Sequence, residues 1–265
     1  MKGSRLWAVL FGCGGFIFSS GFAFGLPASL QVCDDAGEWP PFVYLERMDG
    51  QKTSKVAGLS VSLIHQIADP LGIQLNIELL PWKRCLQGVK DGKYHMLLNA
   101  TVNDERREEY LISNQHSQTT PYYFYINGKV VSQKLARRAD LGLYRVGGIH
   151  GYNYSYYGLE AKDVQSQGIY NYGKLIHRLQ AGEFDLFVEN YEILAGFSAL
   201  GENYLETKGL AYAPIPEMSS TGIHMMFTKS PVGEELKHLV DEGLTRLQND
   251  GTMQAIQMRY FNIIH

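Results

Sequence analysis

Two segments of the chain repeat one pattern 90 positions apart, and this repeat restricts the fold more than any other sequence feature. Gly92–Asn99 and Gly182–Glu189 each begin at a glycine, continue as an apolar run typical of a buried strand, and end in a polar residue. An amphipathic helical stretch precedes each segment, around Leu86–Val89 and Leu175–Leu179. The spacing is about the size of a small α/β lobe, which predicts two similar lobes. The alternative is that helix, glycine and strand form a pattern common to all α/β folds.

Short apolar strands alternate with amphipathic helices, which is typical of βαβ units and a largely parallel sheet. The chain ends in two further helical patterns, and the first of them stops at the turn-rich Asn249–Gly251. We therefore predict strands at Leu30–Cys33, Gln74–Leu79 and His95–Leu98, a turn at Asp34–Gly37, and helices from Gly58 to before Pro70, from Pro81, over Pro231–Leu247 and over Met253–Phe261.

Polar residues stand where the two repeated strands end. Asn99 ends the first repeat, and Glu189 and Asn190 end the second. The carboxyl ends of strands form the ligand-binding edge of open α/β sheets. If the two lobes face each other, these side chains look into one cleft.

The composition is that of a chain that buries a core, since 45% of its 265 residues are hydrophobic and 19% are charged. This excludes a disordered chain, a collagen-like repeat and a disulfide-only miniprotein. A formal net charge of −3 argues against nucleic acid as the main partner, because phosphate binding needs a basic surface. A mean hydropathy of −0.18 with scattered charges excludes a polytopic membrane protein. No sequence pattern indicates a metal site or a cofactor.

The N-terminus has the pattern of a secretory signal peptide over residues 1–25. Two basic residues precede an apolar run over Leu6–Phe18, and small residues end the segment at Ala23–Gly25. A membrane anchor is the alternative, but a span needs about 20 strongly apolar residues. Leu10–Cys13 weakly resembles a lipoprotein signal. We expect a cleaved signal peptide and an exported chain.

Export leaves two cysteines, Cys33 and Cys85, in an oxidising compartment. Two such thiols are expected to form a disulfide, and the alternative is two unrelated buried thiols. Neither cysteine lies in a Cys-x-x-Cys motif, so zinc binding and redox chemistry have no support.

Seven short segments stand along the exported chain in a characteristic order. They are Trp39–Phe42, Gly58, Pro81–Cys85, Thr101–Arg106, Pro121–Tyr123, Gly147–Tyr154, and Asp250–Thr252 with Arg259 and Tyr260. In this order they resemble the family 3 periplasmic solute-binding proteins, the amino-acid-type receptors of ABC importers, and the resemblance covers residues 28–262. The Trp-Lys-Arg-Cys sequence that ends at Cys85, together with Cys33, resembles one subgroup of that family.

The resemblance implies an α/β fold of the two-lobe periplasmic-binding-protein type (type II, Venus flytrap) with mixed, mainly parallel sheets. Residues 26–124 and 223–265 would form lobe I and residues 125–222 lobe II, with two crossing segments as the hinge. It further implies a periplasmic monomer without a cofactor. This monomer would capture a small carboxylate-bearing solute, an amino acid or a derivative, by hinge closure. Its partner would be an ABC permease in the inner membrane.

Three of the family's ligand contacts match residues of lobe I. Arg106 matches the arginine that grips a ligand carboxylate, which a guanidinium binds through two hydrogen bonds. The alternative is that Arg106 and Arg107 belong to a solvated helix face. Thr101 matches a hydroxyl donor to the same carboxylate. Trp39 matches the aromatic residue that stacks on the ligand, and the alternative is a tryptophan packed in the core or in a turn.

Three further contacts match the loop that opens lobe II, at Tyr152, Asn153 and Tyr154. Backbone amides of this loop would complete the carboxylate site, and the tyrosines would stack on a ring. The alternative is an ordinary tyrosine-rich surface loop. At the rim of lobe I, Asp34 or Asp35 would receive a cationic group of the ligand.

Asn190 departs from the family pattern, because amino-acid receptors of this type carry a carboxylate there for the ligand's α-ammonium. An amide accepts a hydrogen bond but supplies no charge to a desolvated ammonium. Adjacent strand residues point to opposite faces, so we expect that Glu189 does not replace it. A small carboxylate, a modified amino acid or an aromatic acid therefore fits the site at least as well as an unmodified amino acid.

Two other functions are compatible with the same fold. A sensory domain would report its ligand to a separate signalling partner. A few proteins similar to this family are periplasmic dehydratases of cyclohexadienyl acids, and Glu189 is the candidate general acid for such a reaction. We expect no enzyme, since the chain carries none of the common catalytic motifs.

Overall fold

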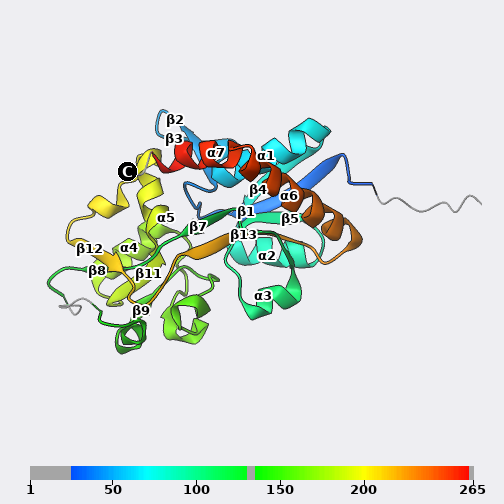
Figure 1. Ribbon diagram of the computed structural model, residues 1–265. Coiled ribbons are helices and arrows are strands. Elements are labelled where there is room, and N and C mark those ends of the chain that lie inside the picture. The colour runs from blue at the N-terminus through cyan, green and yellow to red at the C-terminus, as the bar shows by residue number, and fades with distance from the viewer. Residues whose placement is uncertain (1–24, 130–134, 263–265) are drawn as a thin grey trace, which may run out of the picture.

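The computed structural model describes residues 25–129 and 135–262, which form two α/β lobes around separate sheets (Figure 1). The predicted signal peptide lies outside the described residues, apart from Gly25. No helix within the described ranges is both long enough and apolar enough to cross a membrane.

The sheet of lobe I contains six strands: β1 (Ser29–Asp35), β4 (Gln74–Leu80), β5 (Met96–Ala100), β6 (Leu111–Ile112), β7 (Ser117–Thr119) and β13 (Thr221–Phe227). Their order is β4-β1-β5-β13-β6, and β7 pairs with the start of β13. β4, β1 and β5 are parallel, whereas β13 is antiparallel to each of its neighbours. β1 is two residues longer than predicted at its carboxyl end, so Asp34 and Asp35 belong to the strand and not to a turn.

The helices of lobe I are α1 (Leu59–Ala68), followed by the 3₁₀ turn η1 (Asp69–Leu71), α2 (Trp82–Lys90), α3 (Asp104–Glu109), α6 (Pro231–Asn249) and α7 (Thr252–Phe261). The helices predicted from Gly58, from Pro81 and at the end of the chain are confirmed to within two residues. Gly58 precedes α1 with a φ of 134°, and a Cβ there would lie 2.1 Å from the carbonyl oxygen of Phe42. Glycine is therefore required at the start of α1.

The sheet of lobe II contains β8 (Pro121–Ile126), β9 (Val146–Gly147), β10 (Val164–Gln165), β11 (Leu186–Asn190) and β12 (Leu210–Pro214), in the order β10-β9-β11-β8-β12. Its helices are α4 (Tyr172–Ala181) and α5 (Tyr191–Gly196). Five 3₁₀ turns complete it: η2 (Arg138–Leu143), η3 (Ser155–Tyr157), η4 (Ala161–Asp163), η5 (Phe197–Leu200) and η6 (Tyr204–Glu206).

The predicted repeat corresponds to equivalent places in the two sheets. β5 follows α2 and β11 follows α4 along the chain. Each of the two strands has a parallel neighbour on one side, β1 or β9, and an antiparallel neighbour on the other, β13 or β8. Both sheets are mixed, as predicted, but parallel pairing is limited to three strands in each. The remaining pairs are antiparallel because β13 in the first sheet and β8 in the second run against their neighbours.

The two crossing segments lie side by side. β7 pairs with the first residues of β13, where Thr119 is opposite Thr221. β8 then begins in the other sheet at Pro121. Figure 1 shows β7 and β13 running between the two sheets. The links between the lobes are thus a pair of hydrogen-bonded strands.

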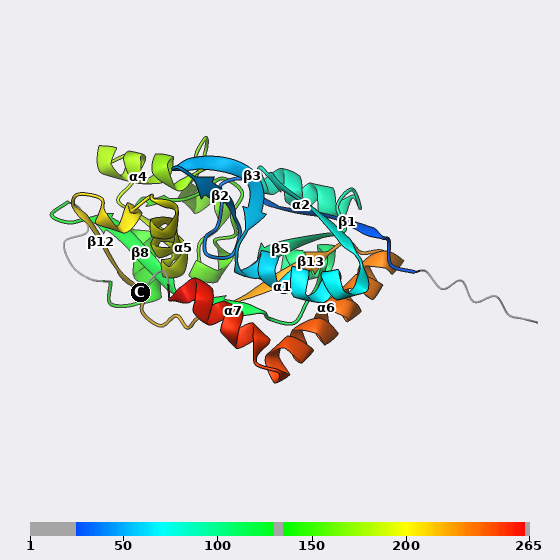
Figure 2. The ribbon, with the colours of Figure 1, turned by 90° about the horizontal axis from the view of Figure 1, so that it is seen from above.

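A two-stranded hairpin, β2 (Tyr44–Met48) and β3 (Gln51–Ala57), stands apart from both sheets and was not predicted. Seen from above, it lies over the lobe boundary (Figure 2). Arg47 of β2 reaches Glu202, which follows α5 in lobe II, at 3.1 Å. The hairpin therefore connects the two lobes.

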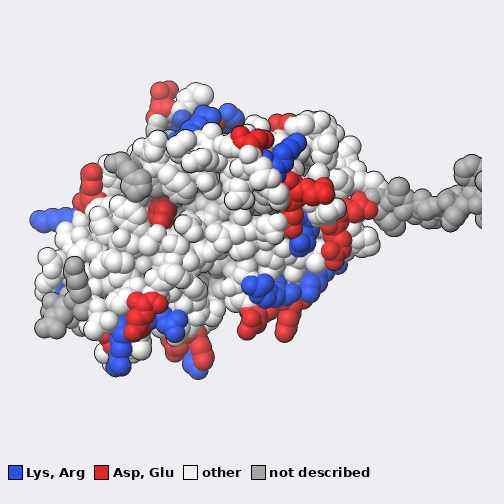
Figure 3. Space-filling view, viewed as in Figure 1, with Lys and Arg blue, Asp and Glu red and all other residues white. Residues whose placement is uncertain are grey.

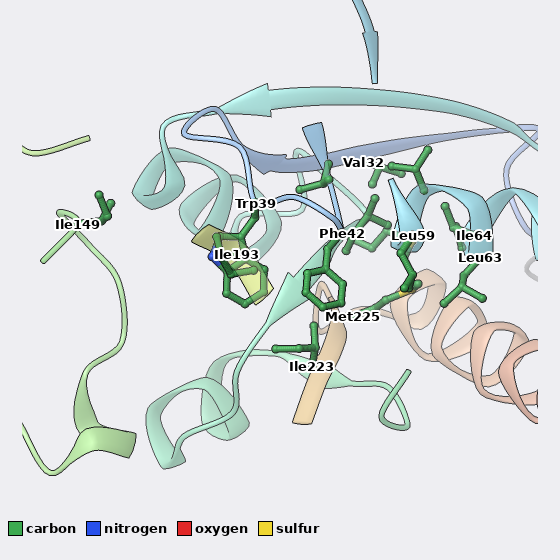
Figure 4. Packing of buried hydrophobic residues seen from close by; sticks show 14 of the residues in the cluster. Val32, Trp39, Phe42, Leu59, Leu63, Ile64, Ile149, Ile193, Ile223 and Met225 are labelled. Atoms are coloured by element: carbon green, nitrogen blue, oxygen red, sulfur yellow. The ribbon is translucent and has the colours of Figure 1, made fainter. Parts of the chain in front are cut away.

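The core of lobe I reaches the lobe boundary. Trp39 packs against Phe42 with ring centroids 5.5 Å apart, and Phe42 lies beside Leu59 of α1 (Figure 4). Cys33 of β1 and Cys85 of α2 form the predicted disulfide, with Cα atoms 5.7 Å apart and both side chains fully buried. The disulfide fixes α2 against the strand that ends at Asp34 and Asp35.

Candidate functional site

A cavity lies between the lobes at the carboxyl ends of β1, β5 and β11. Its walls come from both sheets and from the crossing strand β13. The residues predicted as ligand contacts all line it: Asp34, Asp35, Trp39, Asn99, Thr101, Arg106, Tyr152, Asn153, Tyr154 and Asn190. The repeat therefore does bring Asn99 and Asn190 to one cleft.

Arg106 and Arg107 are neighbours in α3, but they differ in burial. Arg106 is 7% exposed, whereas Arg107 is exposed to solvent. The Arg106 Nη1 donates to the carbonyl oxygen of Thr101 at 2.8 Å, and the guanidinium lies 5.5 Å from the ring centroid of Trp82. Within the described chain, no carboxylate forms an ion pair with Arg106. Burial lowers the pKa of Arg106 to about 10, so the side chain remains cationic at neutral pH.

Thr101 and Asn103 hold this arginine in place. Asn103 caps α3, and its side chain accepts from the backbone N–H of Arg106 at 2.9 Å. The Thr101 hydroxyl accepts weakly from Arg106 Nη1 at 3.4 Å. The remaining donors of the guanidinium are available to an anion in the cavity.

Asp34 is almost completely buried at the end of β1. Its carboxylate accepts from the backbone N–H of Asp35 at 2.8 Å and from the Asn99 amide at 3.1 Å. The Asn99 oxygen in turn accepts from the Ser60 hydroxyl at 2.6 Å. Burial raises the pKa of Asp34 to about 7, against these hydrogen bonds. Asn99 thus orients Asp34 as well as lining the cavity.

Asp35 joins the two lobes. The hydroxyl of Tyr152, from lobe II, donates to Asp35 Oδ2 at 2.6 Å, and the backbone N–H of Gly37 donates to Oδ1 at 2.9 Å. Burial raises the pKa of Asp35 to about 6, although the Tyr152 hydrogen bond opposes this shift. The tyrosine-rich loop is thus a contact to lobe I and not an ordinary surface loop.

Glu189 lines the cavity together with Asn190, so the expectation that it points away is wrong. β11 ends at Asn190, where the chain turns into α5, and the cavity lies at this end of the strand, so consecutive residues of β11 line it. The Glu189 carboxylate accepts from the Asn190 backbone N–H at 2.7 Å and from the Tyr172 hydroxyl at 2.7 Å. Burial raises the pKa of Glu189 to about 7. A carboxylate is therefore present beside Asn190 after all.

Trp39 lies at the cavity and also packs in the core. It lines the cavity, packs on Phe42, and donates from Nε1 to the Tyr172 hydroxyl at 3.1 Å. Because Tyr172 donates to Glu189, one hydrogen-bonded chain runs from lobe I into lobe II. Sequence reasoning missed Tyr172 and Trp82, although Trp82 stands in the quoted Trp-Lys-Arg-Cys segment.

Three buried polar atoms of cavity residues have no hydrogen-bond partner among the described residues. They are the oxygens Asn190 Oδ1 and Thr221 Oγ1 and the nitrogen Asn153 Nδ2. The Asn153 oxygen is engaged, since it accepts from the Ser155 hydroxyl at 2.7 Å. Tyr154 is likewise engaged, because its hydroxyl donates to the Ile149 carbonyl at 3.1 Å. Unpaired buried polar atoms are uncommon, and these line the space where a ligand would supply partners.

Curated relatives of this chain are L-cystine-binding proteins. It is 20% identical over 226 residues to the L-cystine-binding protein TcyA of Bacillus subtilis, covering 85% of this chain and 78% of that protein. It is 23% identical over 229 residues to the L-cystine-binding protein TcyJ of Escherichia coli K12, covering 85% and 80%.

Solved structures share the fold. A Streptococcus pneumoniae amino acid ABC transporter substrate-binding protein, AbpA bound to L-arginine, superposes with a TM-score of 0.71 at 20% identity, covering 89% of this chain and 96% of that one. The arginine-, lysine-, histidine-binding protein ArtJ of Geobacillus stearothermophilus gives 0.70 at 20% identity, covering 88% and 95%. The profile of one family matches residues 30–263. The chain belongs to the bacterial extracellular solute-binding proteins, family 3.

Proposed function

We propose that this protein captures a small zwitterion, an amino acid or a close derivative, between its lobes and delivers it to an ABC importer. One observation carries the proposal: the unpaired guanidinium of Arg106 lines the same buried cavity as the carboxylates of Asp35 and Glu189. A buried charge without a partner costs several kcal/mol. A ligand with a carboxylate and an ammonium removes this cost, because its carboxylate pairs with Arg106 and its ammonium pairs with an acidic side chain of the cavity.

The position of Glu189 changes the ligand class expected from Asn190. An unmodified amino acid was disfavoured because the amide of Asn190 supplies no charge to an ammonium. Glu189 supplies that charge from the adjacent position, and the Asn190 oxygen is free to accept a further N–H. The α-ammonium of an amino acid therefore has a site.

The cavity suits a compact solute. The cavity volume is about 60 Å³, which is room for a few water molecules at about 10–15 Å³ each. An amino acid fits such a space once the lobes adjust around it, whereas an oligosaccharide does not.

Contacts from both lobes support capture by closure. Tyr152 donates to Asp35 and Trp39 to Tyr172, each across the lobe boundary. A ligand held by Arg106 in lobe I and Glu189 in lobe II adds to these contacts in the closed state alone, and thereby shifts the population toward it. We take lobe I as the chain up to β7 and from β13 onward, lobe II as the chain from β8 to β12, and the paired crossing strands as the hinge; the predicted boundaries after residues 124 and 222 fall inside β8 and β13.

The relatives and the leader support the biological setting. The relatives bind L-cystine, and the structural neighbours include receptors with bound L-arginine. With the signal peptide predicted at residues 1–25, these likenesses support the proposal that the protein works as a monomer in the periplasm with an ABC permease as its partner. Binding without turnover is expected, so the ligand should be recovered chemically unchanged.

A thermal-shift screen of the chain without residues 1–25 tests the proposal. A ligand at a hundredfold excess over its Kd stabilises the fold by about 2.7 kcal/mol, which raises Tm by about 5–10 °C. We expect an amino acid to give this shift in the wild-type protein and in Arg107→Ala, but not in Arg106→Ala. Arg107 is the matched control, since it is exposed and adjacent. A shift that survives Arg106→Ala, or no shift with any amino acid, contradicts the proposal.

A further inference from the structure

We infer that Tyr172 is a positioning residue of the binding site. It orients the carboxylate of Glu189 for the ammonium group of the solute, and its hold on that carboxylate is complete when the lobes are closed. This inference rests on the proposed function and deepens it, since it names the residue that links closure to binding. Its support is the burial of Tyr172 and the direction of its two hydrogen bonds.

Tyr172 lies next to the cavity without lining it. It is 1% exposed, and it is not among the described residues of the cavity wall. It is the first residue of α4, whose cap Asn171 accepts from the backbone N–H of Lys174 at 2.9 Å. Its ring packs against Phe197 with centroids 5.2 Å apart. The side chain is thus fixed on a rigid element of lobe II and reaches a solute through its neighbours alone.

Tyr172 holds one of the two oxygens of Glu189. Oε2 accepts from the Tyr172 hydroxyl at 2.7 Å, whereas Oε1 accepts from the backbone and side-chain N–H groups of Asn190, at 2.7 and 3.2 Å. Asn190 is the next residue of the chain and moves together with Glu189. Among the described residues, Tyr172 is therefore the donor that fixes the carboxylate from a separate element. A carboxylate has about four acceptor positions, so one remains for an N–H of the solute.

The direction of the hydrogen bonds at Tyr172 follows from the chemistry of its partners. The indole Nε1 of Trp39 is a donor only, so the Tyr172 oxygen accepts from it, at 3.1 Å. The single hydroxyl proton of Tyr172 is then available to Glu189. Hydrogen bonds in a chain polarise one another, so a hydroxyl that accepts from an N–H donates more strongly. The contact with Trp39 therefore strengthens the hold of Tyr172 on Glu189.

This chain of hydrogen bonds crosses the lobe boundary. Trp39 precedes α1 in lobe I, whereas Tyr172 and Glu189 belong to α4 and β11 of lobe II. Separation of the lobes takes the Trp39 donor away from Tyr172. The Glu189 carboxylate is consequently best prepared for an ammonium group in the closed state. A solute with such a group binds the closed state more tightly for this reason, and that difference in affinity shifts the population toward closure.

The groups that face Glu189 decide which of them a pH profile reports. Besides Tyr172 they are Asp34, Asp35, Arg106, Tyr152, Tyr154 and Tyr157. Burial raises the pKa values of the four tyrosines well above 10, so among these groups the carboxyls are the ones that titrate near neutral pH. The charged side chains on the face in Figure 3 lie mainly around its periphery, so the buried groups set the field at Glu189.

Tyr172→Phe tests the inference, because it removes the hydroxyl and keeps the ring on Phe197. The probes are the standard L-amino acids and L-cystine, and the one that binds the wild-type protein most tightly is titrated by calorimetry between pH 5 and 8. We expect Tyr172→Phe to raise Kd about tenfold at pH 7.5. The pH below which binding weakens should rise by about one unit, since the ionised Glu189 loses a charge-assisted hydrogen bond.

Tyr94→Phe is the matched control. Tyr94 is also buried and donates to a carboxylate, that of Glu78, but it lies outside the cavity wall. It should change neither the Kd nor the pH profile. Urea unfolding of both variants shows that they are folded at the temperature of the titration.

A double-variant cycle assigns the effect to Glu189. In the background of Glu189→Gln, Tyr172→Phe should raise Kd by less than about threefold, because the charge that Tyr172 positions is gone. In stopped-flow experiments the loss from Tyr172→Phe should lie in a faster dissociation rate, since the chain is complete only after closure. An equally large loss of affinity in the Glu189→Gln background means a purely structural role and overturns the inference.

Trp39→Phe tests the link to closure and does not depend on the Tyr172 variant. It keeps an aromatic ring, removes the Nε1 donor and leaves Tyr172 in place. We expect the pH below which binding weakens to rise in this variant too, but by less than in Tyr172→Phe. A pH profile identical to that of the wild-type protein overturns the link to lobe I.

The outcomes separate this inference from the proposed function. Amino acid binding that requires Arg106 but is unchanged in Tyr172→Phe leaves the proposed function standing and removes the inference alone. Binding of none of the probes by the wild-type protein, or binding that is indifferent to Arg106→Ala, removes both.

Discussion

The acidic side chains of the cavity are buried and have no cationic partner among the described residues, and this burial raises their pKa values. Glu189 shows this most clearly, because burial raises its pKa from 4.5 to about 7 while Tyr172 and Asn190 donate to its oxygens. A carboxyl group whose pKa is higher in the folded chain binds its proton more tightly there. Its contribution to stability is therefore fully present at low pH and is lost as the pH rises through the folded value.

The first prediction at this scale concerns the stability of the ligand-free protein. Relative to Glu189→Gln, which cannot ionise, the wild-type protein should lose stability as the pH rises from about 5 to about 8. Urea unfolding at these two pH values measures the difference. Glu206→Gln, at an exposed position, should show no such trend relative to wild type. If the wild-type protein instead becomes more stable relative to Glu189→Gln as the pH rises, the raised pKa of Glu189 is refuted.

His116 acts in the opposite direction, which is why variants are compared and not the wild type alone. Burial lowers the pKa of His116 to about 4, and its Nε2 hydrogen-bonds the Leu98 carbonyl at 3.0 Å. The contribution of His116 to stability is present above its unfolded-state pKa of about 6.5 and is lost as the pH falls toward 4. Comparison with Glu189→Gln at each pH cancels this contribution.

At the scale of single residues, the sequence predicts which side chains line the cavity better than what they contact. Position after a strand, together with the family resemblance, was enough to place Arg106 and Asn190. The network of Glu189 depends on Tyr172, which comes from a different element 17 positions earlier. It also depends on the position of the cavity at the end of β11, where consecutive residues of the strand line it. Neither fact is encoded in a local pattern.

Among the elements, α2 has the clearest link to the site. The Cys33–Cys85 disulfide anchors it to β1, and Trp82 at its first turn lies beneath the guanidinium of Arg106. The chain enclosed by the disulfide spans 52 positions. Such a crosslink restricts the unfolded chain and so stabilises the fold.

Removal of the disulfide by Cys33→Ser with Cys85→Ser should lower the free energy of unfolding by about 2–4 kcal/mol. Urea unfolding of the oxidised protein and of the double variant measures this. The wild-type protein in reductant is the control, and its unfolding free energy should move toward that of the double variant. Unfolding curves that coincide for the oxidised protein and the double variant would show that the crosslink contributes nothing.

The helices were predicted well and several strands were not, for a physical reason. α1, α2, α6 and α7 each bury one face, and the 3.6-residue period of apolar positions reveals it. The hairpin of β2 and β3 is partly exposed and carries charged residues such as Arg47 and Lys52. The hairpin depends on its contacts with the lobe boundary, and no periodic pattern of apolar residues in the sequence predicts such contacts.

For the molecule as a whole, the affinity for a ligand depends on the equilibrium between open and closed lobes. Arg47 contributes to the closed state from the hairpin. It is anchored in lobe I by Glu38, at 2.8 Å, and it contacts Glu202 of lobe II at 3.1 Å. Glu202 is 37% exposed, so water and salt weaken this ion pair.

Glu202→Gln should therefore weaken ligand binding by up to about fivefold, which corresponds to loss of at most about 1 kcal/mol. Calorimetric titration with the ligand found in the thermal-shift screen measures the Kd. Glu206→Gln is again the matched control, four positions along the same segment. Identical Kd values for the two variants would mean that the ion pair does not bias closure. Addition of salt should reduce the difference between them.

The two-lobe arrangement was predictable because the repeat of helix, glycine and strand appears once in each lobe, at β5 and β11. How the lobes touch was not, because contacts such as Arg47 with Glu202 and Trp39 with Tyr172 join positions 133 or more apart. Those contacts decide the closed geometry, and they arise from the three-dimensional arrangement alone.

The late place of β13 in the chain sets the order in which the protein is able to fold. β13 lies between β5 and β6 in the first sheet, and its His224 pairs with Ala100. All five strands of the second sheet are already present when the chain has reached Pro214. In the predicted export, which proceeds from the N-terminus, lobe II has its full set of strands before lobe I does. Lobe I is incomplete until β13 is present. Until then one edge of β5 is unpaired, and chaperones or a wrong strand can bind to it.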